Sequence, residues 1–545
     1  MKVVIIGGVA AGASTAARLR RLDENAEIVM LERGEHISFA NCGLPYYVGG
    51  VIKNRKRLLV QTPKSMHSRF NIDVRVNNEV IRILPQEKQL EIRNIQENYL
   101  ESYDYLVLCP GASPVVPTVP GIDKPNVFKV RNLPDSDIIK QYIEVHKPQH
   151  GVVIGGGFIG LEMADMLNKA GITVTLVEAS PQVMGALDSE MAAIIHAHLL
   201  KRGVNLCLED QLIGFIGDER IEGVVLNSGR TITTDLAVLG IGVKPEVTLA
   251  REAGLNIGST GGIMVDDHLR TSDPFIYAAG DAIQVKDYIT GEDTLLPMAG
   301  PANRQGWVVA NNIAGRPIKY SGVQGTAIIK MMNMVAAVTG KNEKTLKSLG
   351  WDYYTCHIVP SSHATYYPRA TDLTIKILFN PESGKLFGAQ IVGYEGVDKR
   401  IDVLATAIKA GMTVFDLQEL ELAYAPPFSS AKDPINMAGY AAGNIVNQDL
   451  EVIQWEEVPT LVDEGAFLLD ARMPAELKAG KVEGSYNIPV DDVRQHLEEV
   501  PRDREVLVYC RSGLRSYVVC RVLSQLGYKV KNIDGGYLLY QKNAK

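Results

Sequence analysis

The feature that most constrains the fold is a strand–turn–helix–strand pattern that occurs twice, beginning near Lys2 and again near Gly151. The first copy reads KVVIIGGVAAGASTAARLRR followed by AEIVMLER, and the second reads GVVIGGGFIGLEMADMLNKAG followed by ITVTLVEAS. Each copy ends its second apolar run in an acidic residue, Glu32 or Glu178. This order of elements is typical of a βαβ unit that binds a dinucleotide. The sequence therefore predicts an α/β protein with two such units.

The second turn, GGGFIG at residues 155–160, has all three glycines of the GxGxxG fingerprint. Gly155 permits a tight turn, Gly157 lets the backbone approach a pyrophosphate, and Gly160 permits close helix packing. The helix N-terminus then points at the anion. The surrounding strand and helix, with Glu178 further on, favour a dinucleotide site over a purely structural turn. A carboxylate at Glu178 repels a 2′-phosphate, so NADH is favoured over NADPH.

The first turn, GGVAAG at residues 7–12, keeps Gly7, Gly8 and Gly12 but has Val9 at the second glycine position. The backbone is therefore expected to lie a little further from its pyrophosphate. The strand before this turn and Glu32 after it support a second dinucleotide site.

Further segments complete a resemblance to a known superfamily. TSDPFIYAAGDA (271–282) places Gly280 and Asp281 after an apolar strand, where an aspartate can bond a sugar or ribityl hydroxyl. CPGASP (109–114) and LGIGVKP (239–245) look like strand-end crossover motifs, and LPMAGPANRQG (296–306) looks like a flavin-side segment. Together with the two βαβ units, residues 1–445 resemble the two-dinucleotide-binding flavoproteins. The resemblance implies FAD on the first unit, NADH on the second, and a C-terminal dimerisation domain in a homodimer.

The same resemblance implies which residues hold the cofactors. Glu162, just inside the helix of the second unit, is expected to face the flavin and nicotinamide, the alternative being a solvated helix glutamate. The residues expected to bind FAD or NADH are Gly7, Gly8, Gly12, Glu32, Arg33, Asn41, Ala112, Gly155, Gly157, Gly160, Glu162, Glu178, Gly242, Gly280, Asp281, Pro297 and Ala299.

The domain organisation follows from these segments and from changes of pattern along the chain. We expect an FAD-binding domain at residues 1–120 and 246–322, and an NAD-binding domain at 121–245. Strand-like GTAIIKMMNMVAAVTG and LTIKILFN precede helical GVDKRIDVLATAIKAG, so residues 323–445 are expected to form an α+β dimerisation domain. A linker at 446–457 then leads to a small α/β module at 458–545.

One cysteine stands out in SFANCGLPYY, residues 38–47. Asn41 and Gly43 beside Cys42 do not suit an apolar core, so a redox role is favoured over a buried structural one. A reactive thiolate needs a polar or electropositive setting. Dithiol members of the superfamily carry a second cysteine nearby, but none follows here. The segment resembles the single-cysteine branch: coenzyme A-disulfide reductases, NADH-dependent persulfide reductases, and NADH oxidases and peroxidases.

Two tyrosine-bearing segments bear on the choice within this branch. In oxidases and peroxidases the cysteine cycles through sulfenic acid, whereas in the coenzyme A enzymes a coenzyme A thiol serves as the second sulfur. HATYYP (363–368) and LAYAPPFSSAKDP (422–434) resemble the tyrosine segments of the coenzyme A enzymes. Tyr366 and Tyr424 match best, then Tyr367, while Phe428 stands where many relatives carry tyrosine. Simple packing of these aromatic rings is the alternative.

A second reactive cysteine is expected in CRSGLRS, residues 510–516, between an apolar strand and a helix. Backbone N–H groups of such a loop form an anion cradle, and Arg511 and Arg515 add charge that stabilises a Cys510 thiolate. The loop, FLLDAR with Asp470, and DGGY resemble a rhodanese domain that retains its cysteine, although Lys481 departs from the usual histidine-bearing form. The residues expected to bind substrate are Ser38, Asn41, Tyr366, Tyr367, Tyr424, Arg511 and Arg515.

Composition excludes several classes of partner and site. The net charge of −7 disfavours nucleic acid, which needs a basic face. Six scattered cysteines form no CxxC, so a metal site is not expected and a reducing cytoplasm is. The first residues loosely imitate a signal peptide, but a strand and phosphate-binding turn fit them better. No apolar run is long enough for a membrane span.

Three hypotheses follow for the function. The first is an NADH-oxidising, FAD-dependent reductase of coenzyme A persulfide, polysulfide or coenzyme A disulfide, with Cys42 as redox cysteine and Cys510 carrying sulfane sulfur. The second is an NADH oxidase or peroxidase. The third is a sulfur-trafficking protein centred on the rhodanese domain. The cofactors expected are FAD, NADH and coenzyme A.

Overall fold

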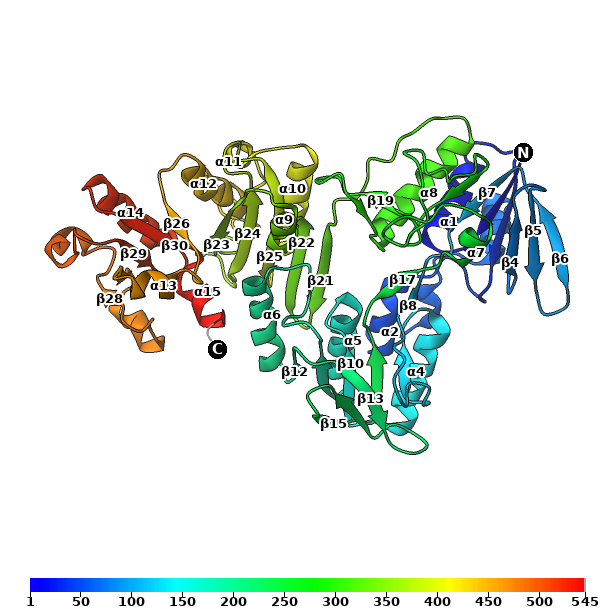
Figure 1. The fold of residues 1–545 in the computed structure, drawn as a ribbon, viewed down its shortest axis with the longest axis horizontal. Helices are drawn as coiled ribbons and strands as arrows, with labels where there is room; N and C mark the ends of the chain where they lie inside the picture. Colours follow the sequence, from blue (N-terminus) through cyan, green and yellow to red (C-terminus); the bar gives the residue numbers. More distant parts are fainter. Residues whose placement is uncertain (544–545) are drawn as a thin grey trace. The chain divides into compact units, whose positions relative to one another are not determined.

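A computed structural model describes residues 1–543, which fold into two compact units (Figure 1). The first unit comprises Met1–Pro181 and Gly203–Val323, and the second comprises Gln182–Arg202 and the chain from Gln324 onward. The chain therefore enters the second unit briefly through one helix, α6 (Ser189–Lys201), before returning to the first.

The first sheet of the first unit has five strands, all parallel, in the order β18-β7-β1-β2-β3. Its strands are Ile276–Ala278, Tyr105–Leu108, Lys2–Ile6, Glu27–Glu32 and Asp73–Val76. The central strand β1 reads KVVII and is buried along most of its length, as expected for a parallel strand covered on both faces. Helices α1 (Ala10–Arg20) and α8 (Ala299–Ile313) pack together closely. A Cβ at Gly306 of α8 would lie 2.3 Å from the Ala11 carbonyl oxygen, so only glycine permits this approach.

The second sheet of this unit repeats the plan, with five parallel strands in the order β12-β11-β10-β16-β9. Its strands are Asn205–Cys207, Thr173–Val177, His150–Ile154, Leu236–Leu239 and Val127–Lys129. Helix α5 (Phe158–Lys169) connects β10 to β11 and completes the second βαβ unit. Both βαβ units predicted from the sequence are confirmed.

Smaller elements complete the first unit. The antiparallel sheets are β4-β5-β6 (Glu79–Leu84, Gln89–Arg93, Asn98–Ser102) and β13-β14-β15 (Leu212–Ile216, Gly223–Leu226, Thr231–Thr233). Two strand pairs are β8 (Ala112–Pro114) with β17 (Val243–Pro245) and β19 (Val285–Lys286) with β20 (Asp293–Thr294). The remaining helices are α2 (Leu44–Val48), α3 (Pro63–Phe70), α4 (Leu133–His146) and α7 (Thr248–Glu252), with 3-10 turns η1 (Asn41–Gly43) and η2 (Arg55–Leu58).

The second unit opens with an antiparallel sheet in the order β21-β22-β25-β24-β23. Its strands are Ala327–Met331, Met334–Gly340, Leu386–Gly393, Leu373–Phe379 and Tyr354–Ile358. Strands β24 and β25 are buried throughout, and α10 (Val397–Lys409) packs on β25 and β22. The other helices here are α9 (Glu343–Leu349), α11 (Val414–Glu419) and α12 (Pro434–Val446). Residues 324–446 thus show the α+β mixture that the sequence predicts.

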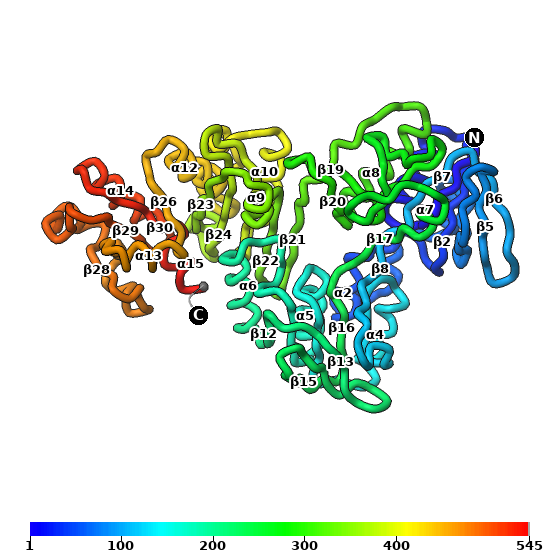
Figure 2. Tube along the Cα trace, in the orientation of Figure 1, coloured from blue at the N-terminus to red at the C-terminus, as the bar shows by residue number. Residues whose placement is uncertain are grey.

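The C-terminal module has a parallel sheet in the order β26-β30-β29-β27-β28, the orange-to-red part of Figure 2. Its strands are Val452–Ile453, Val530–Ile533, Val506–Tyr509, Phe467–Asp470 and Tyr486–Asn487. Its helices are α13 (Val458–Asp463), α14 (Leu514–Gln525) and α15 (Gly536–Asn543), with 3-10 turns η3 (Pro474–Ala479), η4 (Val493–Gln495) and η5 (Leu497–Glu499). Strand β26 lies in the predicted linker, so part of that segment is an edge strand of this sheet.

A buried network of charges joins the antiparallel sheet, α6 and the C-terminal module. The ammonium of Lys376, on β24, lies 2.8 Å from Asp188, 2.5 Å from Glu190 and 2.5 Å from Glu343. On the neighbouring strand β23, His357 Nδ1 lies 2.7 Å from the Asp534 carboxylate, and Nε2 lies 3.2 Å from Glu190. Asp534 follows β30, so this network ties the C-terminal module to the antiparallel sheet.

Among the helices of residues 1–543, none has both the length and the hydrophobicity needed to cross a bilayer.

Candidate active site

The two glycine-rich turns have the same hydrogen-bonding arrangement. In the first, the Glu32 carboxylate accepts from the N–H groups of Gly8 (2.9 Å) and Gly34 (2.8 Å). In the second, the Glu178 carboxylate accepts from the N–H groups of Gly156 (2.6 Å) and Ser180 (2.8 Å). Each carboxylate therefore closes the end of its βαβ unit and keeps further lone pairs for a ribose hydroxyl.

The second turn leaves room for an anion before α5. Gly155 has φ +106°, and a Cβ there would lie 2.4 Å from the Gly240 carbonyl oxygen. A Cβ on Gly160 would lie 1.8 Å from the Gly155 carbonyl oxygen, so glycine is required at both positions. By contrast, a Cβ on Gly157 would meet nothing within 4 Å. This open space, just before the first turn of α5, suits a pyrophosphate.

The segment expected at the flavin converges on the first turn. Gly280 donates its N–H to Gln305 of α8 at 2.7 Å, and α8 begins at Ala299, just after Pro297. No donor among residues 1–543 hydrogen-bonds to the Asp281 carboxylate, and burial raises the pKa of this group. A half-buried carboxylate without a protein partner suits a ligand hydroxyl. The structure thus fits FAD at the first turn and NADH at the second.

Several other residues predicted to bind the cofactors lie at the connection between the two parallel sheets. Ala112 opens β8 and pairs with Pro245 of β17, and Gly242 immediately precedes β17. The Arg33 guanidinium lies 3.6 Å from Glu246, which Arg131 also approaches, at 3.7 Å. Burial and the neighbouring Arg33 lower the pKa of Arg131. Arg131 and Glu246 were not predicted from the sequence, because no motif contains them.

Cys42 lies on the 3-10 turn η1, immediately before α2, and is exposed. Ser38 has φ +43° and donates its N–H to the Gly8 carbonyl oxygen at 2.8 Å. This bond attaches the cysteine segment directly to the first glycine-rich turn, with Asn41 beside the cysteine. The structure therefore brings Ser38, Asn41 and Cys42 to the expected FAD site.

Helix α2 then reaches the second βαβ unit. Tyr46, on α2, donates a hydrogen bond from its hydroxyl to Glu162 of α5 at 3.1 Å. Burial and the Glu162 charge raise the pKa of Tyr46, and burial also raises the pKa of Glu162. The sequence did not identify Tyr46 as a site residue, although its place one helical turn after Cys42 is the signal that could have done so.

The charges around Cys42 are negative rather than positive. Partial burial of its sulfur raises the pKa of the Cys42 thiol, and the carboxylates of Glu162 and Asp281 raise it further. The electropositive setting that a reactive thiolate needs is therefore not supplied by these protein groups. Because both carboxylates act on the Cys42 thiol, Glu162 and Asp281 lie near it. These two residues were each predicted from a separate motif.

The two tyrosine segments meet in the second unit. The hydroxyls of Tyr366 and Tyr424 lie 2.7 Å apart, and these side chains are 75% and 46% exposed. Tyr367 packs its ring edge against His363, with 5.7 Å between the ring centroids. Phe428 is also exposed, as is unusual for a large apolar ring. That these residues line the Cys42 site stays a prediction.

The loop after β29 surrounds the thiol of Cys510, which is buried. Its sulfur accepts hydrogen bonds from the Gly513 N–H at 3.1 Å and from the Ser516 hydroxyl at 3.4 Å. Helix α14 begins at Leu514, so its N-terminus faces this sulfur. Such donors stabilise negative charge on sulfur. Ser516 lies in the loop predicted from the sequence, but the sequence did not identify it as a hydrogen-bond donor to the Cys510 sulfur.

Both loop arginines form ion pairs with carboxylates outside the loop. Arg515 lies 2.5 Å from Glu476 of η3. Arg511 lies 2.8 Å from Asp372, which immediately precedes β24 in the antiparallel sheet. Glu476 and Asp372 could not be found from the sequence, because they are distant from Cys510 along the chain.

Comparison with known proteins places these sites in a family. Family models match residues 1–306 as a pyridine nucleotide-disulphide oxidoreductase, 326–434 as the dimerisation domain of that family, and 454–543 as a rhodanese-like domain. The fold class predicted from the sequence is confirmed by these matches.

Three of the similar proteins serve for comparison. A crystal structure of reduced Bacillus anthracis CoADR-RHD has 53% identity and a TM-score of 0.98, with 99% of this chain and 98% of that chain covered. An NAD-dependent persulfide reductase from A. fulgidus has 37% identity and a TM-score of 0.94, with coverage of 99% and 100%. A Pyrococcus abyssi NAD(P)H sulfur oxidoreductase (CoA-dependent) has 37% identity over 79% of this chain and 96% of its own length. The chain therefore belongs to the pyridine nucleotide-disulphide oxidoreductases and carries the dimerisation domain of that family and a C-terminal rhodanese-like domain.

Proposed function

We propose that the protein is an FAD-dependent, NADH-oxidising reductase of coenzyme A persulfide, polysulfide and coenzyme A disulfide. The observation that carries this proposal is the exposed thiol of Cys42, which is attached to the first glycine-rich turn and coupled to Glu162 at the second. FAD, at Gly7, Glu32 and Asp281, and NADH, at Gly157 and Glu178, would supply the two electrons for reduction.

In this mechanism the Cys42 thiolate attacks the inner sulfur of coenzyme A persulfide. The bond between the two substrate sulfurs breaks, hydrosulfide leaves, and a mixed disulfide of Cys42 with coenzyme A forms. Two electrons and a proton then release the coenzyme A thiol and restore the Cys42 thiolate. With coenzyme A disulfide the same attack releases a coenzyme A thiolate instead.

Tyr46 and Glu162 position this chemistry. The Glu162 carboxylate raises the pKa of Cys42, so it opposes formation of a free thiolate until substrate or cofactor changes the local charge. The hydrogen bond from Tyr46 fixes the Glu162 carboxylate. It also lowers the pKa of Glu162 toward the ordinary value of a glutamate. The pair would therefore limit reaction of the thiolate when no substrate is bound.

Cys510 would carry sulfane sulfur as a persulfide. The loop N–H of Gly513 and the Ser516 hydroxyl can hold a negative charge on sulfur in the cradle. This role favours persulfides over plain disulfides as substrates, because a sulfur-transfer loop is of little use to a disulfide reductase. Coenzyme A itself is a substrate rather than a cofactor in this proposal, since a relative is named for reducing its disulfide. A cytoplasmic homodimer is part of the same proposal.

Two other functions remain as alternatives. An exposed Cys42 without a second thiol in its segment also suits sulfenic acid chemistry, as in an NADH oxidase or peroxidase. A sulfur-trafficking protein centred on Cys510 is the other. The paired Tyr366 and Tyr424 and the retained cysteine loop favour the coenzyme A reductase over the oxidase.

The test compares NADH consumption with coenzyme A persulfide, coenzyme A disulfide, polysulfide, peroxide and oxygen as acceptors. Cys42→Ser should abolish reduction of every sulfur acceptor. Cys510→Ser should lower only those reactions in which the Cys510 loop supplies the sulfane sulfur. Cys207→Ser, at a buried cysteine of β12, is the control for loss of a thiol. Full persulfide reduction by Cys42→Ser, or faster turnover of oxygen than of any sulfur acceptor, would refute the proposal.

A further inference from the structure

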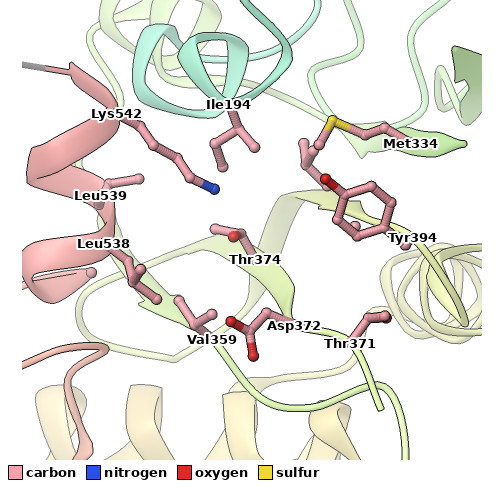
Figure 3. A pocket seen from close by; sticks show the side chains of 13 residues that line it. Ile194, Met334, Val359, Thr371, Asp372, Thr374, Tyr394, Leu538, Leu539 and Lys542 are labelled. Atoms are coloured by element: carbon pink, nitrogen blue, oxygen red, sulfur yellow. The ribbon is translucent and has the colours of Figure 1, made fainter. Parts of the chain in front are cut away.

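The two arginines of the Cys510 loop are held by carboxylates from different parts of the second unit. Arg511 reaches Asp372, at 2.8 Å, just before β24. Its backbone carbonyl also accepts a hydrogen bond from the N–H of Leu538, on α15, at 3.0 Å. Figure 3 shows Asp372 and Leu538 on the two segments that hold Arg511 in this way. The charge of Arg511 is therefore matched by a carboxylate outside the loop.

Arg515 is paired through two hydrogen bonds, and it also interacts with the sulfur. Its Nη1 donates to Oε2 of Glu476 at 2.5 Å, and its Nη2 donates to Oε1 at 2.8 Å. Such a bidentate pair fixes the plane of the guanidinium. Hydrogen bonding to Glu476 raises the pKa of Arg515, and the negative charge of a Cys510 thiolate raises it further. Glu476 and the Cys510 sulfur therefore share one arginine.

Glu476 is held in place by its own turn as well as by Arg515. It lies on η3, and its Oε2 accepts a hydrogen bond from the N–H of Met473 at 3.0 Å. The hydrogen bonds from Arg515 lower the pKa of Glu476, and the one from Met473 lowers it further. The carboxylate is therefore ionised at neutral pH. Both side chains of the pair are 28% exposed, so solvent weakens the effect of their charges without cancelling it.

The balance of charge at the loop bears on the sulfur donor that it accepts. Each loop arginine is matched by one carboxylate, so the two pairs carry no net charge. Lys542 of α15 also lies near Arg511, but it is exposed and solvent screens its charge. Thiosulfate is a dianion, and without an excess of positive charge it is repelled by the Cys510 thiolate. An organic persulfide carries at most one negative charge on its sulfurs and is repelled less.

We propose that Glu476 is a positioning residue that makes Cys510 prefer organic persulfides over the thiosulfate dianion as sulfur donors. The inference rests on the sulfur-carrier role proposed for Cys510 and names its donor. In the transfer, the Cys510 thiolate attacks the outer sulfur of the persulfide. The bond between the two donor sulfurs breaks, a new bond forms from the outer sulfur to Sγ, and the electron pair leaves on the donor as its thiolate. The exchange involves no net oxidation.

The test measures how fast Cys510 of the full-length protein takes up sulfur from thiosulfate or from 2-hydroxyethyl persulfide, without NADH. Rapid quenching and mass spectrometry of the peptide that contains Cys510 give the rate. Glu476→Gln should raise the thiosulfate rate about tenfold and the persulfide rate no more than about threefold, because the removed charge acts on two negative charges in the first donor and one in the second. Glu476→Asp keeps the charge and should restore the wild-type ratio of the two rates.

The matched control is Glu464→Gln, which is exposed at the opposite edge of the sheet, where β27 begins, and should behave like the wild type. Raising the ionic strength from about 0.05 M to about 0.5 M should bring the thiosulfate rates of wild type and Glu476→Gln together, since salt screens exposed charges. Equal changes with both donors in Glu476→Gln would overturn the role of Glu476 and leave the carrier role standing. Failure of the wild type to take up sulfur at Cys510 from either donor would overturn the carrier role as well.

Discussion

The hydroxyl of Tyr46 donates a hydrogen bond to the carboxylate of Glu162 at 3.1 Å and thereby joins the cysteine segment of the first dinucleotide unit to the first helix of the second. Cys42 lies one helical turn before Tyr46, so the three side chains form one electrostatic group. The pKa of the Cys42 thiol therefore depends on residues from both dinucleotide-binding βαβ units.

Glu162→Gln should make Cys42 more acidic. The carboxylate raises the pKa of the thiol, and the neutral amide removes that repulsion while keeping the shape of the side chain. We expect the midpoint of Cys42 alkylation by iodoacetamide to fall by about 0.5–1 pH unit. Glu252→Gln, on exposed α7, should leave it in place. A midpoint that stays fixed in Glu162→Gln would show that burial and Asp281, and not Glu162, raise the pKa of the Cys42 thiol.

Ser516→Ala should weaken sulfur transfer specifically. The hydroxyl is a hydrogen-bond donor to the Cys510 sulfur, and its loss removes stabilisation of a charged sulfur. We expect thiosulfate turnover to fall about fivefold to twentyfold, in line with about 1–2 kcal/mol. NADH-dependent reduction of coenzyme A disulfide should not change. Ser524→Ala, at the exposed end of α14, serves as control, and an equal loss in both variants would contradict a role at the sulfur.

His357→Gln should change the pH dependence of stability. Burial lowers the pKa of His357, but the Asp534 carboxylate outweighs burial and raises it from 6.5 to about 9. A pKa that is raised on folding stabilises the protein fully below 6.5, and this contribution is lost as pH rises through about 9.

The thermal midpoint of wild type should therefore exceed that of His357→Gln most at pH 6, and the gap should narrow by pH 10. Scanning calorimetry across this range measures it, with His67→Gln on exposed α3 as the control. A gap of constant size across the whole pH range would mean that the histidine contributes through packing and not through its charge.

Lys376→Met should destabilise the second unit strongly. Its fully buried ammonium faces the carboxylates of Asp188, Glu190 and Glu343, which together raise its pKa despite burial. Removing the cation leaves these carboxylates without their central partner, at a cost of about 3–5 kcal/mol. Urea unfolding measures the loss, and Lys330→Met, at an exposed position of β21, should lose far less. A small loss in Lys376→Met would mean that the carboxylates become protonated at little cost.

The sequence predicts the parts of this protein that are encoded locally. The two glycine-rich turns, the acidic ends at Glu32 and Glu178, and the cysteine loop each occupy one short segment whose spacing carries the chemistry. Their structures follow the prediction closely. The same holds for the α/β fold class, because each of the two parallel sheets of the first unit contains a βαβ unit with a recognisable order of strands and helix.

The partners that act across the fold could not be predicted in this way. Asp372 meets Arg511, and Asp534 meets His357, only because distant strands come together. Cys42 is the clearest case. A reactive thiolate in its segment predicts a polar or electropositive setting, whereas the fold adds two negatively charged carboxylates from other motifs. Tyr46 could have been recognised from helical spacing, but its partner Glu162 lies in a different unit of the sequence.

The contact between His357 and Asp534 couples the antiparallel sheet to the loop that contains Cys510. Asp534 is followed by the glycine pair that packs on the Cys510 loop, and His357 holds it from β23. The C-terminal module is thus attached to the antiparallel sheet by this buried contact as well as by the chain that connects them. A substitution on β23 that shifts Asp534 can therefore disturb the loop that follows β29 without contacting Cys510 itself.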